Sequence, residues 1–350
     1  MKTFNIKVPD TAISGKIIDK IDNLTKPKGS LGKLESLAYR VCLIQQSLVP
    51  SLCNPANILF AADHGIIEEG VSVSPKEVTW QQLAHFSRGG AGINFLCDQH
   101  GFRLVLVDAG VDYDIPHGHG IIDCKIRKST RNYRREAAMT PEEFDMAIER
   151  GAGIVENVYA GGCNVVSFGE MGSGNTTTSS AVASVLLDRP VREMTGRGAG
   201  LSDTGLHRKV WAIETALEKN RPNPGDPLDV LAKVGGFDIA GMCGIFLGGA
   251  IYRVPVLMDG FISTVAALCA VRLSPGARKA VFASHVSAEP AGRLILDKVG
   301  RKPLITAEMR LGEGTGAVAL MPMLDMALAL YSEGATFDGT GIEAYTPQGG

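Results

Sequence analysis

The sequence has little net charge and no long apolar run. Its 350 residues include 35 basic and 37 acidic side chains, for a formal net charge of −2, so no overall positive field favours nucleic acid as a partner. The longest charge-free apolar stretch, Ile239 to Ile251, has 13 residues and is interrupted by glycines, whereas about 20 apolar residues span a bilayer. We therefore expect neither a nucleic-acid partner nor a membrane span. One basic run, from Lys125 to Arg135, is expected to be a solvated loop.

Paired cysteines and metal-ligand spacings are also absent. The seven cysteines lie more than ten residues apart and form no Cys-x-x-Cys motif, which argues against a zinc site and a disulfide framework. His117 and His119 have no third ligand at a useful spacing. The first ten residues lack the apolar core of a signal peptide. These features predict a cytoplasmic protein with reduced thiols and no metal.

Several familiar enzyme motifs are missing. Residues 169–178 lack the Lys-Ser/Thr pair of a Walker A loop, and Thr177 stands where the dinucleotide fingerprint has its last glycine. Asp108 is followed by Ala109, so the adjacent acids of type I phosphoribosyltransferases are absent. No Gly-x-Ser-x-Gly nucleophile elbow occurs. These absences disfavour the enzyme classes that the motifs define.

Glycine, in contrast, is abundant. The chain has 42 glycines in 350 residues, about 12% where roughly 7% is usual. Four windows hold 18 of them, and these are residues 161–174, 196–205, 235–249 and 312–316. The rest of the chain has an ordinary glycine content, so the surplus indicates four unusual loops in a globular protein rather than a low-complexity chain.

Five short apolar runs each end in a polar turn, and these are residues 57–62, 103–107, 164–168, 254–258 and 280–283. Continuous apolarity predicts strands that are covered on both faces, as in parallel sheets. Segments of helical character lie between or after them, at residues 77–97, 141–159, 175–187, 207–218 and 262–271. This alternation predicts an α/β fold with a doubly wound, mainly parallel, Rossmann-like sheet.

The two chain ends have a different pattern. Ser30 is expected to cap a helix from residue 31 to about 48 that follows no strand, and residues 317–331 form a second apolar helical stretch. We expect a smaller helical domain from residues 1–50 and 317–350. A large α/β nucleotide-binding domain would then span residues 51–316.

Three of the glycine windows have two interpretations each. Residues 169–178 open a helix, so their amides can hold an anion or a ribose, or simply form a tight turn. Residues 196–203 lead into a helix that contains Lys209 and form either a phosphate site or a plain surface loop. Residues 235–244 predict close backbone packing, within the chain or between subunits, with Asp238 as a helix N-cap.

The fourth window places Glu313 between Gly312 and Gly314, just before an apolar helix. A partly desolvated carboxylate has a raised pKa and suits general base catalysis. The alternative is an acid that merely favours the helix dipole.

Seven motifs stand in order along the chain, and these are residues 24–35 (LTKPKGSLGKLE), 62–66 (ADHGI), 169–177 (GEMGSGNTT), 235–241 (GGFDIAG), 259–262 (DGFI), 284–292 (SHVSAEPAG) and 311–316 (LGEGTG). Together they closely resemble the nicotinate-nucleotide:5,6-dimethylbenzimidazole phosphoribosyltransferase family of cobalamin biosynthesis. The likeness runs from about residue 20 to 333.

The resemblance implies transfer of phosphoribose from nicotinate mononucleotide to 5,6-dimethylbenzimidazole, which gives α-ribazole 5′-phosphate and nicotinate with inversion at C1′. It implies Glu313 as the general base, no metal or cofactor, and a homodimer. The implied nucleotide-binding residues are Glu170, Gly172, Gly174, Asn175, Asp238 and Asp259, with Gly198, Gly200, Lys209 and Ser287 near the 5′-phosphate. The implied benzimidazole pocket contains Ser74, Gln81 and Leu311, although Gln81 and Gln82 compete for one role.

Two other functions stay open at this point. One is another nucleotide-using α/β enzyme, such as a dehydrogenase, which predicts a complete dinucleotide fingerprint. The other is a regulatory module that binds a pyridine nucleotide without turnover and assigns no purpose to Glu313. The natural acceptor base is not determined by the residues.

Overall fold

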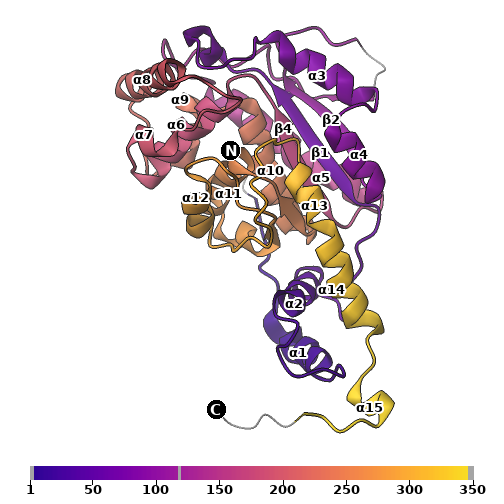
Figure 1. Ribbon diagram of the computed structural model, residues 1–350. Coiled ribbons are helices and arrows are strands. Elements are labelled where there is room, and N and C mark those ends of the chain that lie inside the picture. The colour runs from indigo at the N-terminus through magenta and orange to yellow at the C-terminus, as the bar shows by residue number, and fades with distance from the viewer. Residues whose placement is uncertain (1–3, 117–119, 346–350) are drawn as a thin grey trace.

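A six-stranded sheet forms the centre of the computed structural model, which describes residues 4–116 and 120–345 (Figure 1). The strand order is β3-β2-β1-β4-β5-β6, and each neighbouring pair is parallel. The strands are β1 (Ala56–Ala62), β2 (Arg103–Gly110), β3 (Ile121–Asp123), β4 (Val166–Met171), β5 (Val256–Met258) and β6 (Val281–Ala283). The expected doubly wound α/β fold is confirmed. β3 was not predicted, because it has only three residues and lies largely exposed at the edge.

Helices cover both faces of the sheet. They are α1 (Ser14–Asp22), α2 (Lys33–Gln45), α3 (Glu77–Ser87), α4 (Gly92–Gln99), α5 (Pro141–Ala160), α6 (Asn175–Leu187), α7 (Val191–Met194), α8 (Asp203–Asn220), α9 (Pro227–Val234), α10 (Phe237–Tyr252), α11 (Phe261–Leu273), α12 (Gly292–Val299), α13 (Thr315–Ala319), α14 (Met321–Glu333) and α15 (Phe337–Thr340), with 3-10 turns η1 (Thr11–Ile13), η2 (Gly65–Glu69) and η3 (Pro275–Ala280). In β1, Ile58 and Phe60 join one core cluster, whereas Leu59 and Ala61 join the other. Every residue of β1 is buried, as the continuous apolar run predicts.

Two predicted helix boundaries are wrong. Residues 77–97 form α3 and α4 rather than one helix, because the chain turns at Gly89, whose φ is +81°. Ser30 does not cap α2: the helix starts at Lys33, after Gly32 with φ +53°, and Ser30 lies in the preceding turn. In both places glycine provides the positive φ that ends regular structure.

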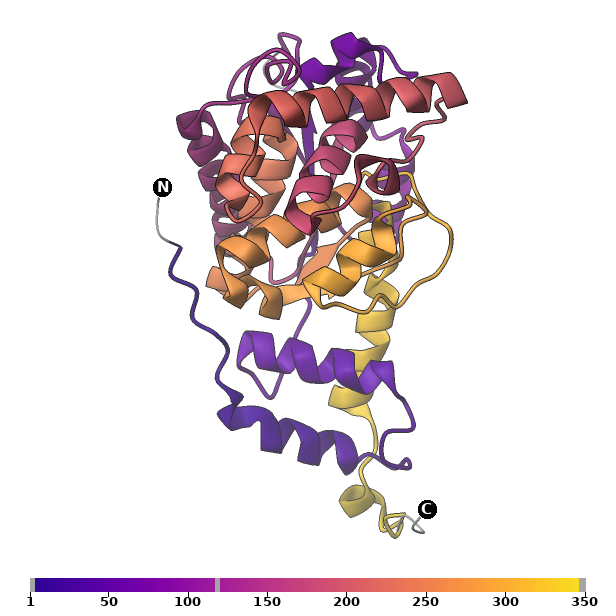
Figure 2. The ribbon, with the colours of Figure 1, turned by 90° about the vertical axis from the view of Figure 1, so that its left-hand side faces the viewer.

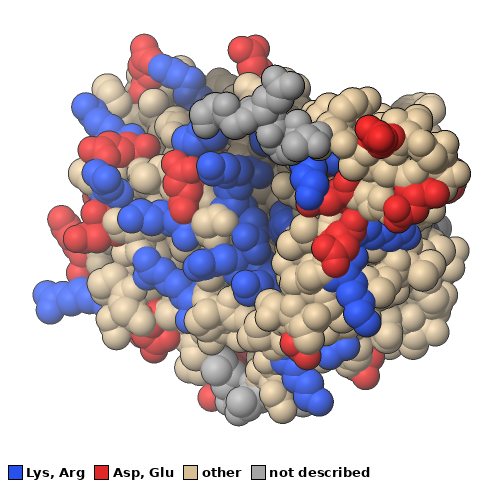
Figure 3. Space-filling view, turned by 90° about the horizontal axis from the view of Figure 1, so that it is seen from below, with Lys and Arg blue, Asp and Glu red and all other residues tan. Residues whose placement is uncertain are grey.

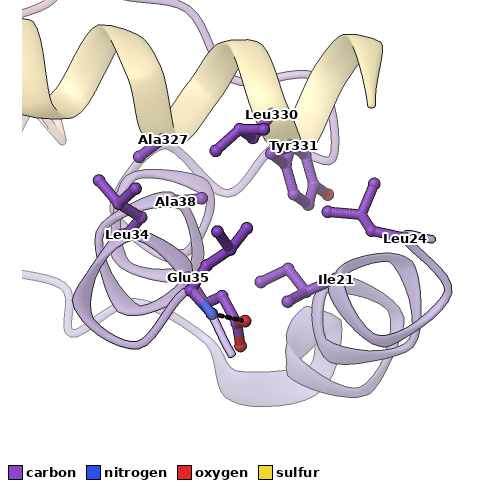
Figure 4. A pocket seen from close by; sticks show the side chains of 9 residues that line it. Ile21, Leu24, Leu34, Glu35, Ala38, Ala327, Leu330 and Tyr331 are labelled. Atoms are coloured by element: carbon purple, nitrogen blue, oxygen red, sulfur yellow. Dashed lines mark hydrogen bonds between the residues drawn. The ribbon is translucent and has the colours of Figure 1, made fainter. Parts of the chain in front are cut away.

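Helices from both ends of the chain pack together below the sheet (Figures 1 and 2). Figure 4 shows apolar side chains of α1, α2 and α14, among them Ile21, Ala38 and Tyr331, pointing toward one another around a small pocket. Glu35 lies at its edge, where its Oε1 accepts a hydrogen bond from the N–H of Leu31 at 3.0 Å. The exact division into two domains stays a prediction.

The continuous helical stretch Thr315–Glu333, which contains α13 and α14, is the only candidate membrane span among residues 4–116 and 120–345. It qualifies by length and composition alone, and 56% of its apolar window is buried inside the structure. A core helix passes the same test, so this stretch is weak support for a membrane location.

The third glycine window packs against α5 of the same chain. A Cβ at Gly151 of α5 would lie 2.0 Å from the carbonyl oxygen of Gly241, and a Cβ at Gly244 of α10 would lie 2.1 Å from that of Ile148. The prediction of close backbone packing is therefore confirmed, with a partner inside the chain.

The basic run at residues 125–135 is not a solvated loop, so that prediction is wrong. Tyr133 is fully buried. Arg131 donates to Glu143 at 2.6 Å, and Lys125 lies 3.0 Å from Asp108. Acidic side chains distant in sequence neutralise the run, and a local charge count does not reveal them.

Candidate active site

A cavity of about 590 Å³ opens where the carboxyl ends of the strands meet their loops. Its walls are the turn after β4, the loop before α8, the start of α11, and residues 285–289 and 308–312. Helices α6 and α11 both begin at this wall. Their free N–H groups make this edge of the sheet suitable for an anionic ligand.

Glu170 ends β4 and lines the cavity. Burial raises its pKa well above the usual range, and the charges of Asp238, Asp259 and Glu313 raise it further. Asn175, the first residue of α6, donates from Nδ2 to Oε2 of Glu170. Burial and the neighbouring carboxylates thus both favour the neutral form of this carboxyl group.

Gly172 and Gly174 shape the turn between β4 and α6. A Cβ at Gly172 would lie 2.2 Å from the carbonyl oxygen of Ala62, and Gly174 has a φ of +94°. Both glycines line the cavity. Here glycine lets the turn lie flat against the end of β1, which leaves the amides of α6 open to the cavity.

Asp259 follows β5 and lines the cavity, but its oxygens are used by the backbone. Oδ2 accepts from the N–H of Gly314 at 3.0 Å, and Oδ1 accepts from those of Gly316 and Ala317 at 2.9 and 3.2 Å. Asp259 therefore caps the start of α13. Burial raises its pKa, whereas His285, whose Nδ1 lies 4.0 Å away, and these N–H groups oppose that rise.

Glu313 lies just before α13 and has a φ of +64°. Its side chain is 8% exposed, and burial together with the charge of Asp259 raises its pKa to about 7. Its carbonyl oxygen accepts from Nδ2 of Asn57 at 3.1 Å. Leu311 and Gly312 line the cavity, and Glu313 is the next residue of the chain but is not part of the lining. The structure thus places a carboxyl group with a near-neutral pKa beside the cavity.

Lys209 of α8 is fully buried. Its Nζ donates to Oγ1 of Thr176 at 2.9 Å and to the carbonyl oxygen of Gly196 at 3.1 Å. Burial lowers its pKa to about 8, and the charge of Glu289 opposes this. Thr176 lines the cavity, while Lys209 lies directly beneath it. A buried ammonium group thus underlies the cavity floor.

The loop above Lys209 carries the other predicted phosphate residues. Gly198 and Gly200 have φ values of +54° and +118° and line the cavity with Ser287. A Cβ at Gly198 would lie 3.7 Å from Nζ of Lys209. Gly198, Gly200, Ser287 and the lysine are therefore brought to one region of the site.

Asp238 has a different position from the one predicted. Gly236 is the N-cap of α10, so the N-cap prediction for Asp238 is wrong. The carboxylate of Asp238 lies 3.2 Å from Nε2 of His64, whose Nδ1 lies 3.0 Å from Oγ1 of Thr178. These side chains are buried and absent from the cavity wall. Asp238 therefore contacts His64 rather than the cavity, and its charge contributes to the raised pKa of Glu170.

The three residues predicted for the benzimidazole pocket separate into two groups. Ser74 and Leu311 line the cavity, and Leu311 is 64% exposed. Gln81 lies exposed on α3, outside the lining, and Gln82 is half-buried. The choice between the two glutamines stays open.

Several polar residues at or near the cavity were not singled out from the sequence as site residues, among them His64, Thr176, His285, Glu289 and Arg310. His64, Thr176, His285 and Glu289 lie inside the motifs at 62–66, 169–177 and 284–292. Membership of these motifs is the sequence feature that could have identified them as site residues. Their positions depend on contacts between distant segments.

Metal ligands do not gather in the described part of the chain, where no group of three His, Cys, Asp or Glu side chains is arranged to hold an ion. His117 and His119 lie outside the described residues. All seven cysteines are free thiols, and five are buried.

The chain is a phosphoribosyltransferase by family: residues 6–342 match the family described as "Phosphoribosyltransferase", and the chain belongs to it. It is 48% identical over 345 residues to the nicotinate-nucleotide–dimethylbenzimidazole phosphoribosyltransferase of Bacteroides fragilis strain YCH46, covering 99% of this chain and 100% of that protein. The protein of the same name from Geobacter sp. strain M21 is 47% identical over 96% of this chain and 97% of its own length. The crystal structure of CobT from Thermus thermophilus has a TM-score of 0.90 and 39% identity, covering 95% of this chain and 99% of that one.

Proposed function

We propose that this protein transfers the 5-phosphoribosyl group of nicotinate mononucleotide to 5,6-dimethylbenzimidazole, forming α-ribazole 5′-phosphate and nicotinate for the lower ligand of cobalamin. The relatives that match over nearly the whole chain carry this activity in their names. The observation that carries the proposal in this chain is Glu313, a buried carboxyl group with a pKa of about 7 beside the cavity.

The reaction suits a site without a metal. In nicotinate mononucleotide the ring nitrogen is a positively charged pyridinium, so the glycosidic bond breaks to leave a neutral ring and needs no ion to hold pyrophosphate. A nitrogen of the benzimidazole attacks C1′ from the opposite face, which inverts the configuration from β to α. Holding both rings in line supplies part of the rate enhancement.

Glu313 removes the proton that this attack makes acidic. When one benzimidazole nitrogen bonds to C1′, the N–H of the other becomes a strong acid, and the carboxylate accepts its proton. A base with a pKa near the working pH is efficient, and such catalysis contributes about 10²–10⁴-fold. The nearness of Glu313 to the cavity wall at Leu311 and Gly312 supports this role.

The other site residues hold the nucleotide. We assign the 5′-phosphate to the amides of Gly198 and Gly200 and to Ser287, with Lys209 beneath them. The carboxyl group of Glu170 and the turn at 172–175 are assigned to the ribose or the nicotinate ring. Asp259 and Asp238 position this machinery through the start of α13 and through His64. Ser74 and Leu311 are assigned to the benzimidazole. Gln81, which lies outside the cavity lining, and Gln82 remain alternatives for one further contact with it.

The deciding experiment incubates the protein with nicotinate mononucleotide and a panel of bases, and reads the configuration at C1′ in the product by NMR. We expect α-ribazole 5′-phosphate from 5,6-dimethylbenzimidazole, and Glu313→Gln to slow its formation at least a hundredfold. Nucleotide binding without product for every base would support the regulatory alternative. Near-native turnover by Glu313→Gln would remove this residue from the base role.

We also propose that the protein is a cytoplasmic homodimer. The proposal rests on the resemblance to the family; Phe95 of α4 and Met326 of α14, which are 64% and 47% exposed, are apolar side chains available for a contact between subunits. Light scattering coupled to size-exclusion chromatography measures the mass. A monomer at micromolar concentration would contradict this part of the proposal.

A further inference from the structure

Three arginine side chains meet at the amino end of β6, on the edge of the sheet opposite the cavity. Arg40 comes from α2, Arg278 from η3, and Arg301 from the segment after α12. Arg40 and Arg301 both donate to the carbonyl oxygen of Val281, Arg301 through Nε at 3.0 Å. Arg301 also donates to the carbonyl oxygen of Arg278. A shared acceptor holds two guanidinium groups side by side, and the third adjoins them.

No acid neutralises this arginine cluster. Within residues 4–116 and 120–345, no carboxylate lies within ion-pair distance of any of the three arginines. The arginines that do form ion pairs there are different residues. The residues outside these ranges include no Asp or Glu. Burial and the charge of Arg301 lower the pKa of Arg40 to about 9, and burial and Arg278 lower that of Arg301 to about 10. The chain supplies three like charges and no side chain of opposite sign.

Arg278 differs from Arg40 and Arg301, because its guanidinium does not donate to a backbone carbonyl oxygen of any described residue. Its guanidinium donates no hydrogen bond to any described residue, and its Nε is buried without a partner. The group lies flat against Gly300: a Cβ there would be 3.6 Å from Nη1 and 3.7 Å from Cζ and Nε. A buried donor of this kind is normally satisfied by a partner. Arg278 is thus held in place with its hydrogen-bonding capacity unused.

We propose that the arginine cluster of Arg40, Arg278 and Arg301 binds a phosphate oxyanion, either inorganic phosphate or the phosphomonoester of a small metabolite. The planar fork of arginine matches phosphate oxygens in a bidentate manner, and a doubly charged anion offsets mutual repulsion among the three cations. Figure 3, which views the end from which α1 and α2 project, shows Lys and Arg side chains gathered along a hollow of the surface.

A bound anion would join two parts of the fold. Arg40 belongs to α2, which packs with α1 and α14, whereas Arg278 belongs to η3 just before β6 and Arg301 to the segment after α12. The guanidinium of Arg40 also lies 4.0 Å above the ring of Phe282 in β6. Phosphate bound to all three arginines links α2 to the segments around β6. The stability of the contact between α2 and the sheet therefore rises with phosphate concentration.

The test compares wild type with Arg278→Gln by thermal unfolding, at constant ionic strength, with and without inorganic phosphate. Without phosphate, Arg278→Gln should be at least as stable as wild type, because it removes like-charge repulsion and no hydrogen bond. With phosphate, wild type should gain stability, and Arg278→Gln should need at least tenfold more phosphate for the same gain. Lys279→Gln, which removes the neighbouring exposed charge, should respond like wild type.

A second variant separates this site from the candidate active site, which also offers phosphate ligands. Lys209→Ala should retain the phosphate response that Arg278→Gln loses. Titrations with inorganic phosphate and with ribose 5-phosphate, followed by calorimetry, distinguish the two sources. The proposal is overturned if Arg278→Gln is equally destabilised in both buffers, or if its response to phosphate equals that of wild type. A response to protein concentration instead of phosphate would assign the cluster to a contact between subunits and would likewise overturn it.

Discussion

Asp259 accepts a hydrogen bond from the backbone N–H of Gly314, the residue after Glu313, at 3.0 Å. Asn57 donates to the carbonyl oxygen of Glu313 itself at 3.1 Å. Two buried side chains, one from β1 and one from the residue that follows β5, therefore hold the single peptide group that links the proposed base to Gly314, one at its C=O and one at its N–H. This arrangement maintains Glu313 at a φ of +64°, which is unfavourable for a residue with a side chain.

Replacing Asp259 should loosen this segment. In Asp259→Ala the N–H groups of Gly314, Gly316 and Ala317 lose their acceptor, so we expect a loss of about 1–3 kcal/mol in the free energy of unfolding. Urea denaturation measures it. Asp297→Ala, which removes an exposed carboxylate, serves as the control. Equal stability of the two variants would show that the cap is dispensable.

The pH dependence of turnover should report Glu313. Its pKa is about 7, and the base acts only when deprotonated, so kcat should fall tenfold per pH unit below that value. Lys209, with a pKa of about 8, should lose its charge above pH 8, and kcat/KM should then decline. Rates measured from pH 5 to 9.5 check both the acidic fall in kcat and the alkaline fall in kcat/KM. A kcat that is flat between pH 5 and 8 would be incompatible with this assignment.

Deprotonation of Glu313 should lower the free energy of unfolding at alkaline pH. Its pKa is about 7 in the folded protein and near 4.5 in the unfolded chain, so the folded state binds the proton more tightly. The stabilisation is complete below pH 4.5 and is lost as pH rises through 7, a change of about 3 kcal/mol. Glu313→Gln mimics the neutral acid and should therefore be more stable than wild type at pH 8.

Unfolding of this variant should be compared at two pH values. Near pH 4.5 the difference between Glu313→Gln and wild type should disappear. Glu333→Gln, at an exposed position of α14, should match wild type throughout. A Glu313→Gln protein that is less stable at pH 8 would show that Glu313 makes favourable contacts that outweigh its burial.

Two glycines of α5 provide a matched pair. A Cβ at Gly151 would lie 2.0 Å from the carbonyl oxygen of Gly241 in α10, whereas a Cβ at Gly153 would meet nothing within 4 Å. Gly151→Ala should separate the helices and destabilise the protein by about 1–3 kcal/mol or more. Gly153→Ala should stabilise it by roughly 0.5–1 kcal/mol through helix propensity. Chemical denaturation should give opposite signs for the two variants.

Lys209 should act mainly on nucleotide affinity. Hydrogen bonds to a charged group are worth about 1.5–3 kcal/mol, so Lys209→Ala should weaken nicotinate mononucleotide binding roughly ten- to hundredfold. Its effect on the rate of the bound complex should be smaller, because the ammonium lies beneath the loop at Gly198 rather than beside Glu313. Calorimetry and single-turnover kinetics separate the two effects. Lys219→Ala, exposed on the same helix, is the control, and an unchanged affinity in Lys209→Ala would remove this lysine from the phosphate site.

Local patterns predicted the elements that depend on neighbouring residues. The five apolar runs became strands, and residues 175–187 became α6 with the predicted bounds. The prediction failed at Gly89 and before Lys33, where a glycine with positive φ interrupts the helical pattern. Glycine permits a positive φ but does not require it, so the sequence alone does not show where the helix ends. The edge strand β3 was missed because three residues are too few for a pattern.

By itself, the sequence determined the parallel sheet, the edge where its loops gather, the close-packed glycine helix, and the family. These follow from periodicity, composition and motifs that are local in the chain. Only the tertiary structure decided that Asp259 caps α13, that Asp238 pairs with His64, and that the pKa of Glu313 lies near 7. Hydrogen bonds and desolvation depend on groups that are far apart in the chain, and no local pattern records which of them will meet.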